Sequence, residues 1–255
     1  MRSRPHKTRR IAASLALGGL TYLFTVFGAV ADERKTAVIE LFTSQGCSSC
    51  PPADEYLGEL VDRKDLLVLT LPVDYWDFLG WKDTLASPAY SQRQRAYART
   101  RNDRNVYTPQ MVINGRVHAI GSYRKDVEAS LVATGPEFEA MRVGVDLALE
   151  GKRIKISIGE NPSVTPVKDA TIWLALFNRS EKVKIGRGEN SGRYLTYTNV
   201  VREFVPIGMW SGEAKQISLP HKDLMQPGYD GCAVIVQAHD TGPIYGVAAL
   251  ENLSE

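Results

Sequence analysis

The hydrophobic pattern of the chain changes near residues 133–139, and this change restricts the fold more than any other feature. Before it, short apolar runs alternate with helical patterns, and after it almost every run is typical of a strand. The first part predicts strands at 37–43, 66–71, 110–113 and 117–120, and helices at 53–61, 88–100 and 125–133. The second part predicts seven strands, at 142–149, 154–159, 170–178, 194–205, 213–219, 232–239 and 244–250. We therefore expect an α/β first half, with a βαβ unit followed by a β-hairpin and a helix, and an all-β, sandwich-like second half.

The first 31 residues are typical of a signal peptide. Five basic residues precede an uncharged apolar run at 11–30, and Ala29-Val30-Ala31 has the small-residue pattern of a cleavage site. If it is not cleaved, the run is also long enough to span a bilayer with its basic end in the cytoplasm. Both outcomes place the chain from Asp32 onward outside the cytoplasm. We expect a periplasmic or secreted protein, or an inner-membrane anchored one if the leader is retained.

Once the leader is removed, about 225 residues remain, a length that suits one large domain or two small ones. We divide them into a first domain at 32–136, with an inserted segment at 74–104, and a β-rich second domain at 137–255. The chain has 31 basic and 29 acidic residues, and five of the basic ones lie in the leader. The mature chain is therefore slightly acidic, which gives no electrostatic reason to expect binding to nucleic acid.

Two cysteines lie where the first predicted strand gives way to a helix, in the sequence Cys47-Ser48-Ser49-Cys50-Pro51. A CxxC pair in this position is typical of a redox site, because the partial positive charge of a helix N-terminus stabilises a thiolate. Cys47 is then the nucleophile, and Cys50 resolves the mixed disulfide. The alternatives are an inert structural disulfide and half of a metal site. Because no second ligand pair has suitable spacing, we expect neither a metal site nor a cofactor.

A second motif resembles part of the thioredoxin fold. The stretch VYTPQMVINGR at 106–116, followed by Gly121, looks like the thioredoxin strand pair that opens with a cis-proline. By this resemblance, Thr108 and Pro109 lie opposite the CxxC and hold the backbone of a substrate protein, with the bond before Pro109 in cis. Independently, Asn114-Gly115 predicts a tight turn between the two strands.

Three further stretches resemble the DUF1223 family of secreted proteins. They are ELFTSQGCSSCPPAD at 40–54, DYWD at 74–77 and GWKD at 80–83. The resemblance covers most of the mature chain and implies a thioredoxin-like fold and export. It brings no established activity, so the function must be inferred from the site.

The segment at 74–83 follows the second predicted strand, so we expect it at the edge of the sheet that also carries the CxxC. Its aromatic residues, Trp76 and Trp81 among them, either line a substrate groove or form a hydrophobic cap. Asp74 is a possible acid/base group for a thiol, although loop carboxylates are more often solvated or capping. By resemblance to thioredoxin, Glu40 is the other candidate, because it lies near the place of that family's buried acidic residue.

Two further features have ordinary structural interpretations. The arginines at 93, 95, 99, 101 and 104 predict a solvated basic surface, with docking of an acidic partner as the alternative. Cys232 lies on an alternating apolar strand with Val234 and Val236, which predicts a buried free thiol.

The sequence thus favours an exported thiol–disulfide oxidoreductase that acts on the thiols or disulfides of other extracytoplasmic proteins. One alternative is a binding module in which the CxxC is a structural disulfide. Another is a carrier that holds a soft metal on the two thiolates.

Overall fold

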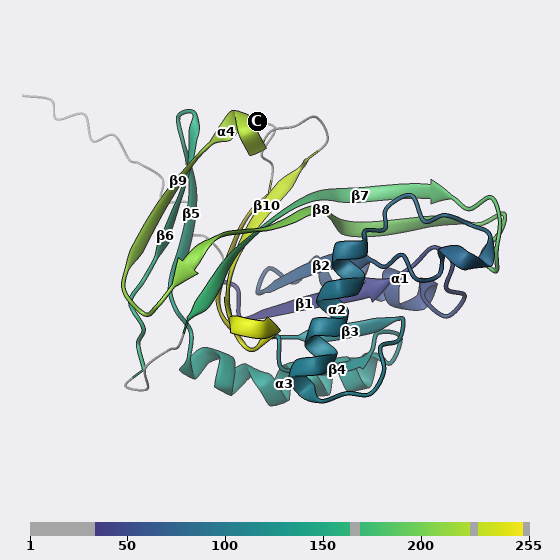
Figure 1. The fold of residues 1–255 in the computed structure, drawn as a ribbon, viewed down its shortest axis with the longest axis horizontal. Coiled ribbons are helices and arrows are strands. Elements are labelled where there is room, and N and C mark those ends of the chain that lie inside the picture. Colours follow the sequence, from purple (N-terminus) through teal and green to yellow (C-terminus); the bar gives the residue numbers. More distant parts are fainter. Residues whose placement is uncertain (1–33, 164–168, 225–228, 252–255) are drawn as a thin grey trace, which may run out of the picture. The chain divides into compact units, whose positions relative to one another are not determined.

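In the described part of the chain, eight strands form a central sheet in the order β11-β10-β7-β8-β2-β1-β3-β4 (Figure 1). The computed structural model describes residues 34–163, 169–224 and 229–251, and the predicted signal peptide lies outside them. From the first half come β1 (Ala37–Thr43), β2 (Leu66–Pro72), β3 (Gln110–Ile113) and β4 (Val117–Ile120). From the second half come β7 (Ala170–Lys184), β8 (Tyr194–Trp210), β10 (Gly231–Ala238) and β11 (Ile244–Glu251).

Helices cover both faces of the first half of this sheet. The side chains of β1 alternate between the faces, as strand geometry requires. Val38 and Phe42 pack with residues of α2 (Pro88–Arg101), whereas Ile39 and Leu41 pack with α1 (Pro51–Leu60) and α3 (Arg124–Ala140). Burying a side chain of this size contributes about 1.5–3 kcal/mol. Burial on both faces explains why β1 is an almost continuous apolar run.

The ends of the helices follow from local sequence signals. Pro51 and Pro52 open α1, where a missing backbone N–H costs nothing. The hydroxyl of Ser87 accepts a hydrogen bond from the N–H of Ala89 (3.3 Å) at the start of α2. That helix ends at Asn102, whose φ of 59° is left-handed. Three shorter helical turns lie at Asp77–Leu79, His221–Leu224 (α4) and His239–Thr241.

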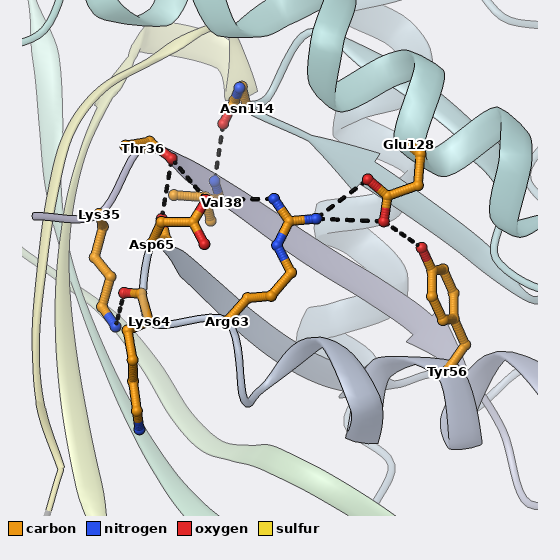
Figure 2. A network of polar contacts seen from close by, with 9 residues as sticks. All are labelled: Lys35, Thr36, Val38, Tyr56, Arg63, Lys64, Asp65, Asn114 and Glu128. Atoms are coloured by element: carbon orange, nitrogen blue, oxygen red, sulfur yellow. Dashed lines mark hydrogen bonds and ion pairs between the residues drawn. The ribbon is translucent and has the colours of Figure 1, made fainter. Parts of the chain in front are cut away.

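The predicted tight turn between β3 and β4 is confirmed. Asn114 and Gly115 have φ angles of 53° and 68°, as a two-residue hairpin turn with two left-handed positions requires. The side chain of Asn114 also accepts a hydrogen bond from the N–H of Val38 (2.8 Å), which ties the turn to β1 (Figure 2).

A polar network joins α1 and the loop after it to α3 (Figure 2). Glu128 of α3 accepts hydrogen bonds from the hydroxyl of Tyr56 (2.8 Å) and from the guanidinium of Arg63 (3.1 Å). Arg63 also pairs with Asp65 at 3.3 Å. These groups are partly exposed, so each pair contributes little energy, but together they fix the orientation of α1.

The second half is rich in strands, as predicted, but its strands are divided between two sheets. A three-stranded sheet of β5 (Val145–Glu150), β6 (Arg153–Ile158) and β9 (Lys215–Pro220) packs on β7 and β10. The other four strands extend the central sheet, because β8 pairs in parallel with β2, with Thr70 opposite Val200. The predicted domain boundary between 136 and 137 falls inside α3, and the described residues from 34 to 251 form one compact unit.

Cys232 lies in the core between these two sheets. It is a free cysteine with no exposed surface, which confirms the predicted buried thiol. Burial raises the pKa of this thiol to about 12, so the reactive thiolate is scarce there. Within the described ranges, no helix is both long and apolar enough to cross a membrane.

Candidate functional site

Cys47 and Cys50 form a disulfide in the turn that joins β1 to α1, with their Cα atoms 5.4 Å apart. Cys50 is the N-cap residue of α1, and its carbonyl oxygen accepts hydrogen bonds from the N–H groups of Ala53 (2.8 Å) and Asp54 (3.1 Å). The N–H of Cys50 in turn donates to the carbonyl oxygen of Cys47 (3.3 Å). The positive end of the helix dipole therefore lies at the turn that carries both sulfur atoms.

Both cysteines are fully buried, although the two serines between them are exposed. Trp76 covers one side of the turn, because a Cβ added at Gly46 would lie only 3.0 Å from the Cβ of Trp76. The indole N–H of Trp76 donates to the hydroxyl of Thr108 (2.8 Å). The structure thus brings two of the predicted site residues together beside the CxxC.

The peptide bond between Thr108 and Pro109 is cis, as predicted. The carbonyl oxygen of Pro109 accepts a hydrogen bond from the N–H of Gly121 (3.0 Å). A Cβ at Gly121 would lie 3.0 Å from the Cβ of Ala53, in the first turn of α1. The start of β3 and the start of α1 are therefore close neighbours.

Trp81 and Asp83 hold Gln45, two residues before the first cysteine. The indole N–H of Trp81 donates to Oε1 of Gln45 (2.8 Å), and the N–H of Gln45 donates to the carboxylate of Asp83 (2.7 Å). Burial raises the pKa of Asp83, and hydrogen bonds from the backbone oppose that shift in part. The indole N–H groups of Trp76 and Trp81 thus tie the 74–83 segment to Thr108 and to Gln45.

The second half of the chain covers another side of the CxxC turn. We call residues 185–193, between β7 and β8, the ribbon tip; these two strands form a long two-stranded ribbon (green in Figure 1). The side-chain amide of Asn190 donates to the carbonyl oxygens of Gln45 (3.0 Å) and Cys47 (2.9 Å). The carboxylate of Glu189 accepts a hydrogen bond from the N–H of Ser48 (3.3 Å). Sequence reasoning missed Asn190, which is 143 residues from Cys47 and has no local pattern that marks it.

A buried carboxyl group lies one helical turn after Cys50. Asp54 is 5% exposed, and within the described residues neither of its carboxyl oxygens has a hydrogen-bond partner; the same holds for the hydroxyls of Thr43 and Tyr197. Burial raises the pKa of Asp54 well above its usual value, and the nearby charge of Asp83 adds to this shift. Asp54 therefore stays protonated over a wider pH range than an ordinary aspartate.

The two predicted acid/base candidates are occupied by other partners. Glu40 is fully buried, and Arg93 contacts both of its oxygens (2.6 and 3.1 Å). Asp74 accepts a hydrogen bond from the hydroxyl of Ser91 on α2. Among the described residues, no group of three or more histidine, cysteine, aspartate or glutamate side chains is placed to hold a metal ion.

The prediction of a solvated surface is wrong for Arg93, which is only 7% exposed. Arg93 lies three residues after Tyr90 and four before Tyr97, so it shares the buried face of α2 with both. The hydroxyl of Tyr97 also donates to Glu40, and the guanidinium donates to the side chain of Gln237 (2.9 Å). Position 93 is therefore the centre of a buried polar network.

These features define a class of mixed α/β proteins with a large central sheet and a buried CxxC disulfide at a strand-to-helix junction. A family model described as "Protein of unknown function (DUF1223)" matches residues 38–237, and the chain belongs to this family. It is similar to the crystal structure of a protein from Agrobacterium tumefaciens, with 34% identity and a TM-score of 0.75 over 87% of this chain and 96% of that one. It also shares its fold with HBP35 of Porphyromonas gingivalis, at 12% identity and a TM-score of 0.61 over 87% of this chain and 76% of that one. A search of curated proteins gave no match.

Proposed function

We propose that this protein is an exported thiol–disulfide oxidoreductase whose redox pair is Cys47 and Cys50. The observation that carries the proposal is the disulfide in the turn that starts α1, where the helix dipole stabilises a thiolate. The strand order β2-β1-β3-β4, with α1 and α3 on one face and α2 on the other, supports a thioredoxin-like first half. The N-terminal leader in the sequence supports action outside the cytoplasm, where protein disulfides persist.

The chemistry is reversible disulfide exchange with a partner protein. A partner thiolate attacks the sulfur of Cys47, the bond to Cys50 breaks, and Cys50 leaves with the electron pair and takes up a proton. The second thiol of the partner loses its proton and attacks the partner's own sulfur in the mixed disulfide, so that the bond to Cys47 breaks and Cys47 leaves with the electron pair and takes up a proton. The partner is then oxidised to a disulfide, and the CxxC is reduced to two thiols. In the reverse direction, the Cys47 thiolate attacks the disulfide of a partner.

The residues around the disulfide have supporting roles in this proposal. Thr108 and Pro109, next to the start of α1, present the backbone that holds the partner. Trp76 positions Thr108 through its indole hydrogen bond, and Trp81 positions the loop before Cys47 through Gln45. None of these four side chains takes part in the transfer of electrons.

One observation favours a second candidate, a binding module with a structural disulfide. Both cysteines have no exposed surface, whereas exchange requires a partner sulfur to reach Cys47. In this alternative the disulfide only fixes the start of α1, and the protein acts by binding its partner.

The roles of the two cysteines are tested with single substitutions. Reduced Cys50→Ala is incubated with a synthetic peptide closed by one disulfide, and the products are quantified by mass spectrometry. The variant should accumulate a mixed disulfide between Cys47 and the peptide, because the resolving thiol is gone. Wild type should instead release the peptide as a dithiol and recover its own disulfide.

Cys47→Ala is the matched control, and it should accumulate far less adduct because Cys50 is the less reactive thiol. Alkylation of the reduced protein at increasing pH should also show that Cys47 loses its proton below the pKa of an ordinary thiol. Equal trapping by both variants, together with ordinary titration of Cys47, would favour the binding module.

A further inference from the structure

The ribbon tip places a part of the second half directly against the CxxC turn, and two of its side chains, Glu189 and Asn190, bond to that turn. Ile185 is fully buried at the start of the tip, and Asn190 is 1% exposed at its centre. The exposed Glu189 accepts the hydrogen bond from Ser48, the residue that follows the first cysteine. The tip is thus anchored by buried side chains even though most of its residues are exposed.

Asn190 occupies the backbone acceptors that flank the first cysteine. Its Nδ2 group donates to the carbonyl oxygens of Gln45 and Cys47, at 3.0 and 2.9 Å. The guanidinium of Arg193 donates to Oδ1 of the same side chain (3.0 Å), which fixes the orientation of the amide. An amide that donates to two main-chain carbonyls fills the same acceptors that the backbone N–H groups of a bound peptide would fill. A partner that pairs with this stretch of backbone must therefore first displace Asn190.

Trp81 holds the tip from the side of the first half. A Cβ added at Gly186 would lie 2.7 Å from Cζ3 of Trp81, so the tip approaches this ring as closely as glycine permits. The same indole is hydrogen-bonded to Gln45. Gln45 is thus joined to the tip in two ways. Its carbonyl oxygen bonds directly to Asn190, and its side chain bonds to Trp81, which packs against Gly186 of the tip.

We infer that the ribbon tip is a gate over the redox site, closed by Asn190, and that disulfide exchange requires its displacement. This inference rests on the proposed function and adds its regulation. A partner able to replace the bonds of Asn190 at Gln45 and Cys47 opens the gate as it binds, whereas small thiols in the surroundings do not. A tip that is closed in this structure and open during exchange explains why both cysteines are fully buried here although exchange requires access to Cys47.

The test compares the rate at which tris(2-carboxyethyl)phosphine reduces the Cys47–Cys50 disulfide in full-length variants. Asn190→Asp keeps the size of the side chain and its contact with Arg193, but turns a carboxylate oxygen toward two carbonyl oxygens. Loss of the hydrogen bonds and the new repulsion should speed reduction by roughly tenfold or more. Arg187→Ala, at an exposed position of the same tip, should leave the rate roughly unchanged.

Gly186→Ala is a second test variant, because its added methyl group would collide with the Trp81 ring and weaken the packing of the tip. It shows whether faster reduction follows from displacing the tip or only from the new charge at position 190. The φ of Gly186 is not in the left-handed region, so alanine at this position strains the packing against Trp81 and not the backbone. The gate predicts faster reduction in this variant too, with unchanged circular dichroism in both. Equal rates in wild type and both variants would overturn the gate, even if the protein exchanges disulfides with a dithiol peptide. Faster reduction in the variants without any peptide exchange would support the gate and overturn the oxidoreductase.

Discussion

Replacing Arg93 with methionine is expected to lower the free energy of unfolding by about 3–5 kcal/mol, because the change leaves a buried carboxylate without its cation. Glu40 has no exposed surface and receives two hydrogen bonds from Arg93. The guanidinium also lies 4.2 Å from the centre of the Phe204 ring and donates to Gln237. One side chain therefore connects β1, α2, β8 and β10. Urea unfolding of the oxidised protein, followed by circular dichroism, measures the loss.

Two variants separate the ion pair from general effects of the substitution. Arg95→Met, two residues along the same helix at an exposed position, should change the free energy of unfolding by less than about 0.5 kcal/mol. The double variant Glu40→Gln/Arg93→Met should recover a part of the loss, because no buried charge is left unpaired. If Arg93→Met and Arg95→Met were equally stable, the buried pair would not contribute to the stability of the fold.

Replacing Asp54 with asparagine is expected to make the protein less sensitive to rising pH. In the folded state the pKa of Asp54 lies well above its usual value of 3.8. The contribution of this carboxyl group to the free energy of unfolding is therefore fully present at pH values below the usual pKa. That stabilisation is lost as pH rises toward the folded-state pKa, at up to about 1.4 kcal/mol for each pH unit. Asparagine is neutral throughout, so the variant should gain stability over wild type as pH increases. Urea unfolding at a series of pH values measures the difference.

Asp62→Asn is the matched control, because Asp62 lies on the exposed turn after α1. Its stability profile should run parallel to that of wild type. Burial also raises the pKa of Asp83. Because the charge of Asp83 acts on Asp54, the difference between the two proteins includes the coupling of these two carboxyl groups. A profile for Asp54→Asn that is parallel to wild type at all pH values would show that Asp54 has an ordinary pKa.

The fold and the candidate site depend on both halves of the chain. Glu40 and Arg93 of the first half are completed by Gln237 of the second, and the CxxC turn is covered by Asn190. Neither half is therefore expected to retain its arrangement alone, although the sequence divides them clearly.

Local sequence was sufficient to predict most secondary structure, because the spacing of apolar residues and the turn signals act over a few residues. Every predicted strand and helix is present near its expected position, with the largest difference at α3, which continues through Pro136 to Ala140. The turn at Asn114-Gly115 and the buried thiol of Cys232 followed from the same short-range patterns. The position of the CxxC before a helix was equally local.

Only the tertiary structure decided which of these elements meet. The pairing of β2 with β8 joins Thr70 to Val200, and no short-range pattern encodes a partner so distant in the chain. Arg93 was expected in water because polar side chains usually lie there, but Glu40 and Gln237 satisfy it in the core. Asn190 is buried beside the CxxC turn for the same reason: its hydrogen-bond partners are main-chain carbonyls brought near by the sheet. The sequence determined where the two sulfurs lie relative to a helix, and long-range packing determined that both cysteines are buried.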